Sequence, residues 1–165
     1  MVAVKILDVK DFMSKLLIGE VFDTFWMTEL EILTSNQYKI NGHLNQSWYD
    51  QQELELLGAR EYAKWKEMKP LAFQIIKGNK TPQVLKVVFM YPKKGIFHFL
   101  EEIKSSFKED QIEGLFLNIR YENNNLTIVT GTSIAVFSMD KSLEKEWDEK
   151  VKVFLKAKEI VFEEM

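Results

Sequence analysis

The fold is decided by residues 84–138, VLKVVFMYPKKGIFHFLEEIKSSFKEDQIEGLFLNIRYENNNLTIVTGTSIAVFS. Residues 84–91 are apolar on both faces except for Lys86, which predicts a strand that is covered on both sides. A helix is predicted next, because the following apolar residues recur at helical spacing: Ile96, Phe99, Leu100, Ile103 and Phe107. Residues 115–121 and 126–130 alternate around an asparagine-rich turn, which indicates a hairpin. The predicted order is strand, helix, strand, strand.

The N-terminal part of the chain predicts the same order of elements. Residues 2–7 are typical of a short strand, and Asp8 precedes a helical stripe of apolar residues that ends at Gly19. Two further β-rich segments follow and are joined by a polar turn. We therefore predict two pseudo-repeated βαββ(β) halves, at about 2–44 and 84–138. The alternative is that this common order recurs by chance, since residue identity between the halves is slight.

A helical insert is predicted between these halves, at about 47–78, because capping-box spacing at Asp50 and Glu53 precedes further apolar residues at helical spacing. Within it, large apolar residues such as Trp65 and Leu71 are expected to pack on the sheet. A C-terminal helix is predicted at about 142–157 from its apolar stripe. The expected class is α+β, in one domain of residues 1–165.

Composition excludes several classes of function. The chain has 165 residues, a net charge of −3 and no cysteine, so disulfides, thiolate metal sites and thiol catalysis are excluded. No stretch approaches the roughly 18 apolar residues that a membrane helix needs. We expect a soluble cytoplasmic protein with no membrane association.

Candidate site residues are few, and no catalytic set or metal site is predicted. Asn118 and Arg120 lie on the polar side of a strand, where Arg120 suits an anion or a stacking partner. Thr130 and Thr132 flank Gly131, and His43 lies in a turn. These five are the ligand-binding candidates, although solvent exposure or turn formation explains each of them. No cofactor is predicted.

Four lysines form a candidate basic corner: Lys77, Lys80, Lys93 and Lys94. Because phosphate binding needs clustered positive charge, this corner is the one feature that favours nucleic acid. The acidic residues Glu101 and Glu102 on the outer face of the predicted second helix oppose it. We expect no binding of duplex DNA.

Several short motifs spread over the chain resemble a family of small uncharacterised bacterial proteins, a domain of unknown function: DVKDFMSKLL at 8–17, NGH at 41–43, IKGNKTP at 76–82, GLFLNIRY at 114–121, TGTS at 130–133 and DKSLEKEWDE at 140–149. This resemblance supplies no substrate, cofactor or catalytic residue. The predicted topology also looks like a domain of DNA sliding clamps, whose helices present Lys and Arg to DNA. The chain departs from that pattern in its acidic helix face.

The function predicted from the sequence is a non-enzymatic cytoplasmic interaction or scaffold module with an unidentified protein partner. Two alternatives stay open. One is a clamp-like accessory protein of DNA metabolism, and the other is a small-molecule-binding protein or enzyme with a pocket near Arg120 and Thr132. The sequence also leaves oligomerisation open.

Overall fold

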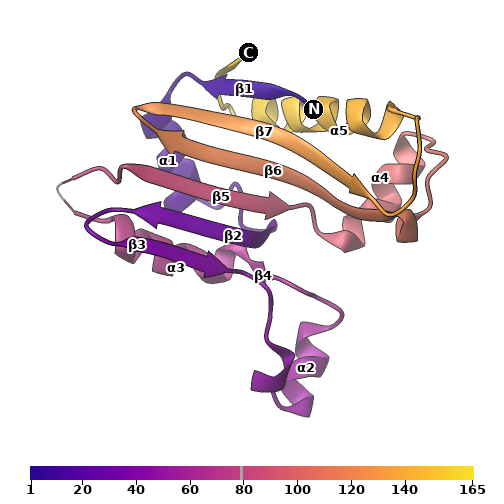
Figure 1. The fold of residues 1–165 in the computed structure, drawn as a ribbon, viewed down its shortest axis with the longest axis horizontal. Coiled ribbons are helices and arrows are strands. Elements are labelled where there is room, and N and C mark those ends of the chain that lie inside the picture. Colours follow the sequence, from indigo (N-terminus) through magenta and orange to yellow (C-terminus); the bar gives the residue numbers. More distant parts are fainter. Residues whose placement is uncertain (79) are drawn as a thin grey trace.

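The computed structural model describes residues 1–78 and 80–165, so Asn79, part of the loop predicted after residue 78, lies outside the described residues. Within these ranges the chain forms an α+β fold of five α-helices and eight strands (Figure 1). The elements follow in the order β1 (Ala3–Ile6), α1 (Val9–Leu17), β2 (Trp26–Leu33), β3 (Gln37–Asn41), α2 (Gln51–Leu57), β4 (Ala63–Lys64), α3 (Trp65–Ile76), β5 (Val84–Met90), α4 (Ile96–Glu102), β6 (Ile112–Glu122), β7 (Asn125–Ile134), α5 (Ser142–Ala157) and β8 (Phe162–Glu164).

The strands form one sheet in the order β3-β2-β5-β6-β7-β1-β8, with β4 paired to β2. All of the pairings are antiparallel. The two long central strands β6 and β7 form the predicted hairpin, and Asn123 and Asn124 at its turn have positive φ angles of 51° and 63°. Asparagine tolerates this conformation better than most residues, which explains why the turn forms there.

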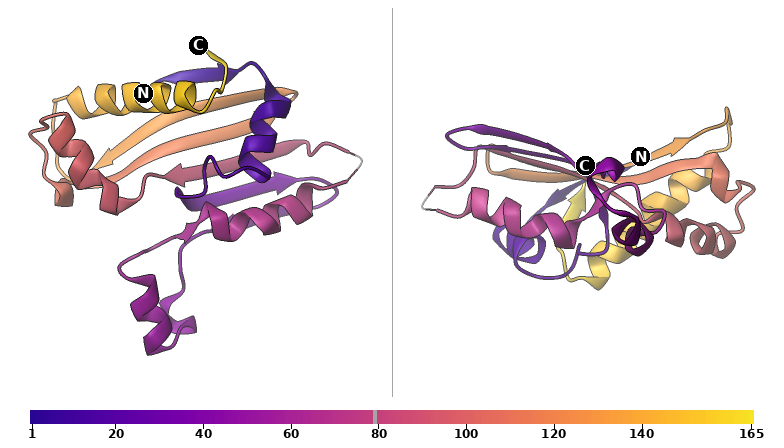
Figure 2. Two further views of the ribbon diagram at one scale, coloured as in Figure 1. Left: turned by 180° about the vertical axis from the view of Figure 1, so that it is seen from behind. Right: turned by 90° about the horizontal axis from the view of Figure 1, so that it is seen from below.

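Among the described residues, helices α1, α3, α4 and α5 lie on one face of the sheet and leave the other face without a helix (Figure 2). The core is the layer between them, where alternate strand residues such as Leu85, Phe89 and Leu117 are fully buried. Helix α5 contributes the predicted apolar stripe of Leu143, Trp147, Val151 and Leu155. The buried side chains between these helices and the sheet form the main hydrophobic cluster of the fold.

The pseudo-repeat is not confirmed, because the two predicted halves pair differently. Strand β5 pairs with β6 of its own half, whereas β1 pairs with β7 and β8 and lies far from β2. The first helix therefore crosses the sheet instead of returning the chain to a neighbouring strand. The likeness to a sliding-clamp domain, which rested on that repeat, is not confirmed either.

The predicted helical insert divides into two unlike parts. Helix α3 packs on the sheet as expected, with Trp65 fully buried, and it continues through Pro70. The expectation that Leu71 packs on the sheet is wrong, because its side chain is 46% exposed. The preceding residues leave the body of the fold altogether.

Candidate functional site

Residues 45–61 form an arm that extends from the sheet beyond its edge strand β3 (Figure 1). In this fully described segment no residue is buried. Local hydrogen bonds order it, since the Asp50 carboxylate accepts a bond of 2.8 Å from the N–H of Glu53 and caps α2. That bond lowers the pKa of Asp50. The arm is therefore a folded projection without a core of its own.

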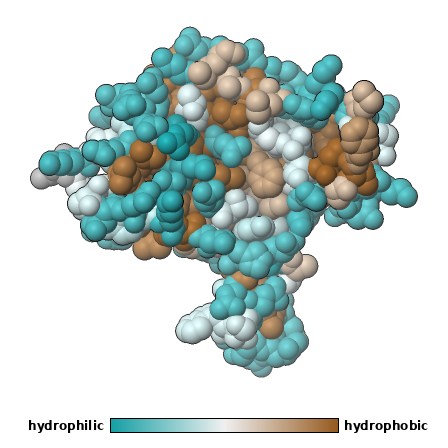
Figure 3. Space-filling model, viewed as in Figure 1, coloured by the Kyte–Doolittle hydropathy of each residue, from teal (hydrophilic) through white to brown (hydrophobic). Residues whose placement is uncertain are grey.

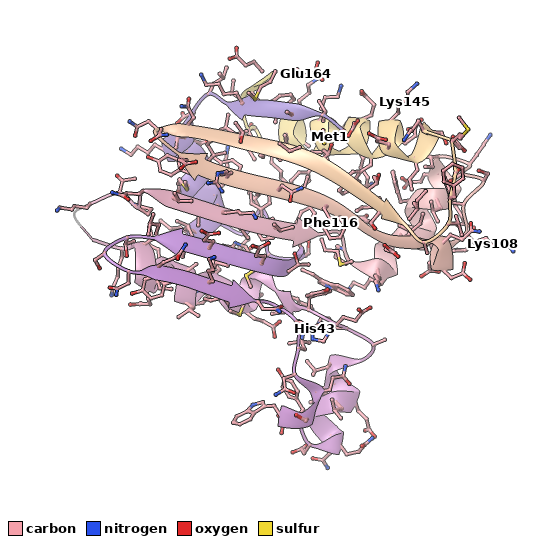
Figure 4. The ribbon with its side chains drawn as sticks, viewed as in Figure 1. Met1, His43, Lys108, Phe116, Lys145 and Glu164 are labelled. Atoms are coloured by element: carbon pink, nitrogen blue, oxygen red, sulfur yellow. The ribbon has the colours of Figure 1, made fainter. Side chains whose placement is uncertain are left out.

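The two ends of the arm are joined at its base. The N–H of Leu44 donates a hydrogen bond of 2.8 Å to the carbonyl of Glu61. Next to it, His43 and Tyr62 form an isolated β-bridge, and their rings meet edge to face at 5.4 Å. His43 lies where the arm leaves the body (Figure 4). Its position supports the predicted turn and strand-end role more directly than a ligand-binding one.

Gly42 allows the base to lie tightly against β2. A Cβ atom at this position would lie 1.7 Å from the carbonyl oxygen of Met27, far inside van der Waals contact. The N–H of Gly42 donates to Thr28 at 3.0 Å and its carbonyl accepts from Ala63 at 2.9 Å. Only glycine fits this junction, and it fixes the direction in which the arm leaves.

Two ion pairs attach the base of the arm to the body. Arg60 pairs with Glu67 at the start of α3, and Glu61 pairs with Lys93 after β5. Burial alone would raise the pKa of Glu67, but hydrogen bonds from Arg60 and from the N–H of Lys64 outweigh it and lower that pKa. The arm is thus held by charge as well as by the backbone.

The surface of the arm is both apolar and acidic. The side chains of Trp48 and Leu56 are 80% and 89% exposed. Asp50, Glu53 and Glu55 are exposed around them. Trp and Leu are costly to leave in water, so the arm carries an exposed apolar surface with acidic groups around it.

A groove beside α4 has a volume of about 760 Å³. Its floor is apolar and consists of Ile96, Leu100 and Phe107. Its rim is charged with both signs, and Lys108 marks the rim in Figure 4. We call it the α4 groove. Volume and lining are within the usual range of sites for small amphipathic molecules.

The helix-free face of the sheet contains the predicted residues Asn118 and Arg120. Apolar side chains gather over the middle of this face (Figure 3), where Phe116 lies (Figure 4). Asn118 is half-buried and donates to the carbonyl of Val129 at 3.2 Å, while exposed Arg120 pairs with Glu122 at 3.0 Å. Both side chains are engaged with their own sheet.

Thr130 and Thr132 face the helices, on the side of the sheet opposite Arg120. The hydroxyl of buried Thr130 lies between the N-terminal strand and Asp148 of α5. Thr132 lines a separate hollow of about 300 Å³ with Met1 and the start of α5. The predicted pocket near Arg120 and Thr132 is therefore not one site, because alternation along β6 and β7 separates the two residues.

The predicted basic corner is also divided. Lys77 and Lys80 lie before β5, and Lys93 and Lys94 lie after it, at opposite ends of the strand (Figure 1). Lys93 is paired with Glu61 of the arm base. The four lysines do not form one patch.

Among the residues that the structure places, none form a group of three or more possible metal ligands. No helix in residues 1–78 and 80–165 is both long and apolar enough to cross a bilayer. The site residues predicted from the sequence did not include Trp48 or Leu56. One signal was present, because Leu56 falls outside the stripe of Leu54 and Leu57.

A family model described as "Family of unknown function (DUF5721)" matches residues 15–163. No curated protein and no solved structure matches the chain.

Proposed function

Because the chain belongs to this family of unknown function, we propose a role from its surface: it is a non-catalytic interaction module that binds a partner protein with its arm. We also propose the cytoplasm as its compartment, as the cysteine-free composition led us to expect.

One observation supports this role above the others, the exposure of Trp48 at 80% and Leu56 at 89% on a projection with no buried residue. These side chains contribute nothing to the core. Leaving apolar surface in water costs about 25 cal/mol of free energy for each Å² that could be buried. Tryptophan is enriched among the residues that dominate interface energies. The arm has the composition of a binding surface.

The hydrogen-bonded base of the arm supports the same role. Its ends are joined by the Leu44–Glu61 hydrogen bond, and α2 is capped before any partner arrives. A pre-ordered binding segment loses less conformational entropy on association. The scattered positions of Asn118, Arg120, Thr130, Thr132 and His43 support a non-catalytic role, since these groups do not converge on one substrate.

The experiment uses the absence of native cysteine. Ser47→Cys is labelled with a benzophenone maleimide, and Ser142→Cys, at an exposed position at the start of α5 on the body, is the matched control. We expect a discrete protein adduct from position 47 after irradiation in lysate, absent from position 142. The adduct is lost when Trp48→Ala and Leu56→Ala are added.

Two results contradict the proposal. One is an adduct that survives the double substitution. The other is a fall of more than about 1 kcal/mol in the free energy of unfolding of the double variant, measured with the protein monomeric, because exposed side chains should then change stability by only a few tenths. That second result would assign Trp48 and Leu56 to folding.

A second candidate function is the binding of a small amphipathic molecule in the α4 groove, favoured by its apolar floor of Ile96, Leu100 and Phe107. Anilinonaphthalene sulfonate is a suitable probe, and its fluorescence should rise on titration and fall in Leu100→Asn. Equal fluorescence with both proteins would exclude the groove as the binding site.

A further inference from the structure

We infer that the partner of the arm is a second copy of this chain: two copies pair their β3 strands edge to edge about a two-fold axis, and each arm lies against Lys77 and Lys80 of the other copy. This inference rests on the proposed function, since the arm is the contact surface in both.

Strand β3 has a free hydrogen-bonding edge. It ends the sheet order and pairs only with β2 among the described residues. The N–H of Gly42 donates to Thr28 of β2 at 3.0 Å. Along an antiparallel strand, residues whose backbone groups bond to the neighbouring strand alternate with residues whose backbone groups point the other way. Since Gly42 bonds to β2, the backbone N–H and C=O groups of Gln37, Lys39 and Asn41 point away from the sheet. These groups can form an antiparallel ladder with the same groups of another β3.

Exposed apolar side chains lie beside that free edge, on the helix-covered side. Tyr38 is opposite the buried Ile32 in register and is 37% exposed, and Leu71 of α3 is 46% exposed. Leu71 is turned by about 200° from Lys69 around the helix, and Lys69 reaches Gly19 just after the end of α1. Leu71 therefore faces away from α1, toward the edge of the sheet. A second copy at this edge would cover Tyr38 and Leu71.

Charges of opposite sign lie at the two ends of β3. The arm follows its last residue, Asn41, and exposes Asp50, Glu53 and Glu55. The other end adjoins the loop that leads into β5, because the N–H of Gln83 donates to Leu33 at 2.8 Å. This loop and the end of α3 carry Lys77 and Lys80, at the end of β3 that is opposite to the arm.

A two-fold axis joins these opposite ends. Antiparallel pairing of two β3 strands places the last residue of each beside the first residue of the other. The acidic arm of one copy then meets Lys77 and Lys80 of the other copy, twice in each dimer. Trp48 of the arm can contact the same two lysines of the other copy, since an indole face attracts a lysine ammonium.

Lys39 at the centre of the edge does not prevent this pairing. A lysine on an edge strand usually discourages association. Here Lys39 is directly opposite Glu31 of β2 on the helix-free face, so an acidic residue of the same copy lies beside it and offsets part of its charge.

The first experiment measures the mass of the full chain by sedimentation velocity. We expect a dimer for the wild type, and a dissociation constant raised by roughly 10- to 100-fold in Lys39→Pro, which removes an outward N–H from each copy. The matched control is Glu164→Pro on the opposite edge strand β8, whose N–H also points away from its neighbour; it should leave the dimer unchanged. Circular dichroism checks that both variants fold.

The second experiment exchanges charges without altering β3. Protein A contains Glu53→Lys and Glu55→Lys, and protein B contains Lys77→Glu and Lys80→Glu. Each alone has like charges at both contacts, so its dimer should weaken by about tenfold or more. Mixed together, A and B regain opposite charges at both contacts and should form a heterodimer of near wild-type affinity.

Three results overturn the inference: a wild-type monomer at about 100 μM, well above the Kd of a stable dimer, a dimer that Lys39→Pro leaves intact, or no heterodimer from A and B. If the wild type is monomeric while the position 47 adduct still depends on Trp48 and Leu56, the arm binds a different protein and the proposed function survives. If the dimer forms but the adduct does not depend on these side chains, the proposed function fails by itself.

Discussion

The indole Nε1 of Trp65 donates a hydrogen bond of 2.8 Å to the backbone carbonyl of Leu16. Leu16 lies in the last turn of α1, where carbonyl groups have no partner within the helix. The first residue of α3 thus gives a hydrogen-bond partner to a free carbonyl at the end of α1. The indole ring is fully buried, and its centroid lies 5.3 Å from that of the Phe89 ring. This one side chain joins two helices to the sheet.

Trp65→Ala should lower the free energy of unfolding by about 3–5 kcal/mol, because it leaves both a cavity and an unpaired buried carbonyl. Trp65→Phe keeps most of the volume and should cost about 1–3 kcal/mol for the lost hydrogen bond. Chemical denaturation measures both. Trp48→Ala is the matched control and, at a protein concentration low enough for the chain to be monomeric, should change stability by less than about 0.5 kcal/mol; equal losses at positions 48 and 65 would contradict the division of the insert.

Gly42→Ala should destabilise the protein by about 1–3 kcal/mol, because the new methyl group would force the arm base away from the Met27 carbonyl. The junction should also become sensitive to limited proteolysis. Gly131→Ala is the control, since its Cβ would meet its nearest neighbour at 3.6 Å, an ordinary contact. If the two variants behave alike, close approach at Gly42 is not the reason for glycine there.

Glu67→Gln tests the attachment of the arm by its pH dependence. The pKa of Glu67 is lowered in the folded state, so its ionised form stabilises the fold above the ordinary carboxyl pKa, and this stabilisation is lost as the pH falls through the folded pKa. The variant should be less stable than wild type by under about 1 kcal/mol at neutral pH, since the pair is partly exposed. The difference should shrink in acid; a difference that stays constant with pH would disprove the role of this charge.

Duplex DNA should not bind at physiological salt. The net charge is −3, and Lys77 and Lys93 are at opposite ends of β5. Fluorescence anisotropy with a labelled duplex should show no saturation in the range of about 10⁻⁴–10⁻⁶ M where non-specific binders saturate. Micromolar binding that weakens steeply with added salt would restore the alternative of a clamp-like accessory protein.

Much of the local structure was predictable because periodicity reports which face of an element is buried. The stripe of Leu143, Trp147, Val151, Phe154 and Leu155 predicted α5, and the alternation around Asn123 predicted the β6–β7 hairpin. Asp8 caps α1 as its position indicated, accepting from the N–H of Asp11 at 3.0 Å.

The order of strands was not predictable in the same way. Periodicity says that β1 has a buried face but not which strand lies beside it, and β1 pairs with β7, more than 120 residues away in sequence. Such pairing depends on how the whole sheet closes its hydrogen bonds. The pseudo-repeat was inferred from element order alone, and strand order is independent of it.

The candidate site was predicted least well. Asn118 and Arg120 do share the helix-free face, as alternation indicated, but Thr130 and Thr132 face the other side of the sheet. Helical spacing made residues 50–57 resemble a core-facing segment. A helix of seven residues with leucines has no fixed partner in the sequence, so only the three-dimensional path shows that α2 leaves the core.

The hydrogen bond between Leu44 and Glu61 closes the base of the arm, so the arm can be exchanged as a unit. The body of the fold holds the arm at its base, through this hydrogen bond of 2.8 Å and the ion pairs of Arg60 and Glu61. Because the entropic cost of closing a loop grows slowly with its length, the arm can be lengthened, shortened or exchanged with little effect on the stability of the body. Partner choice in this architecture can therefore diversify while the sheet and its helices stay the same.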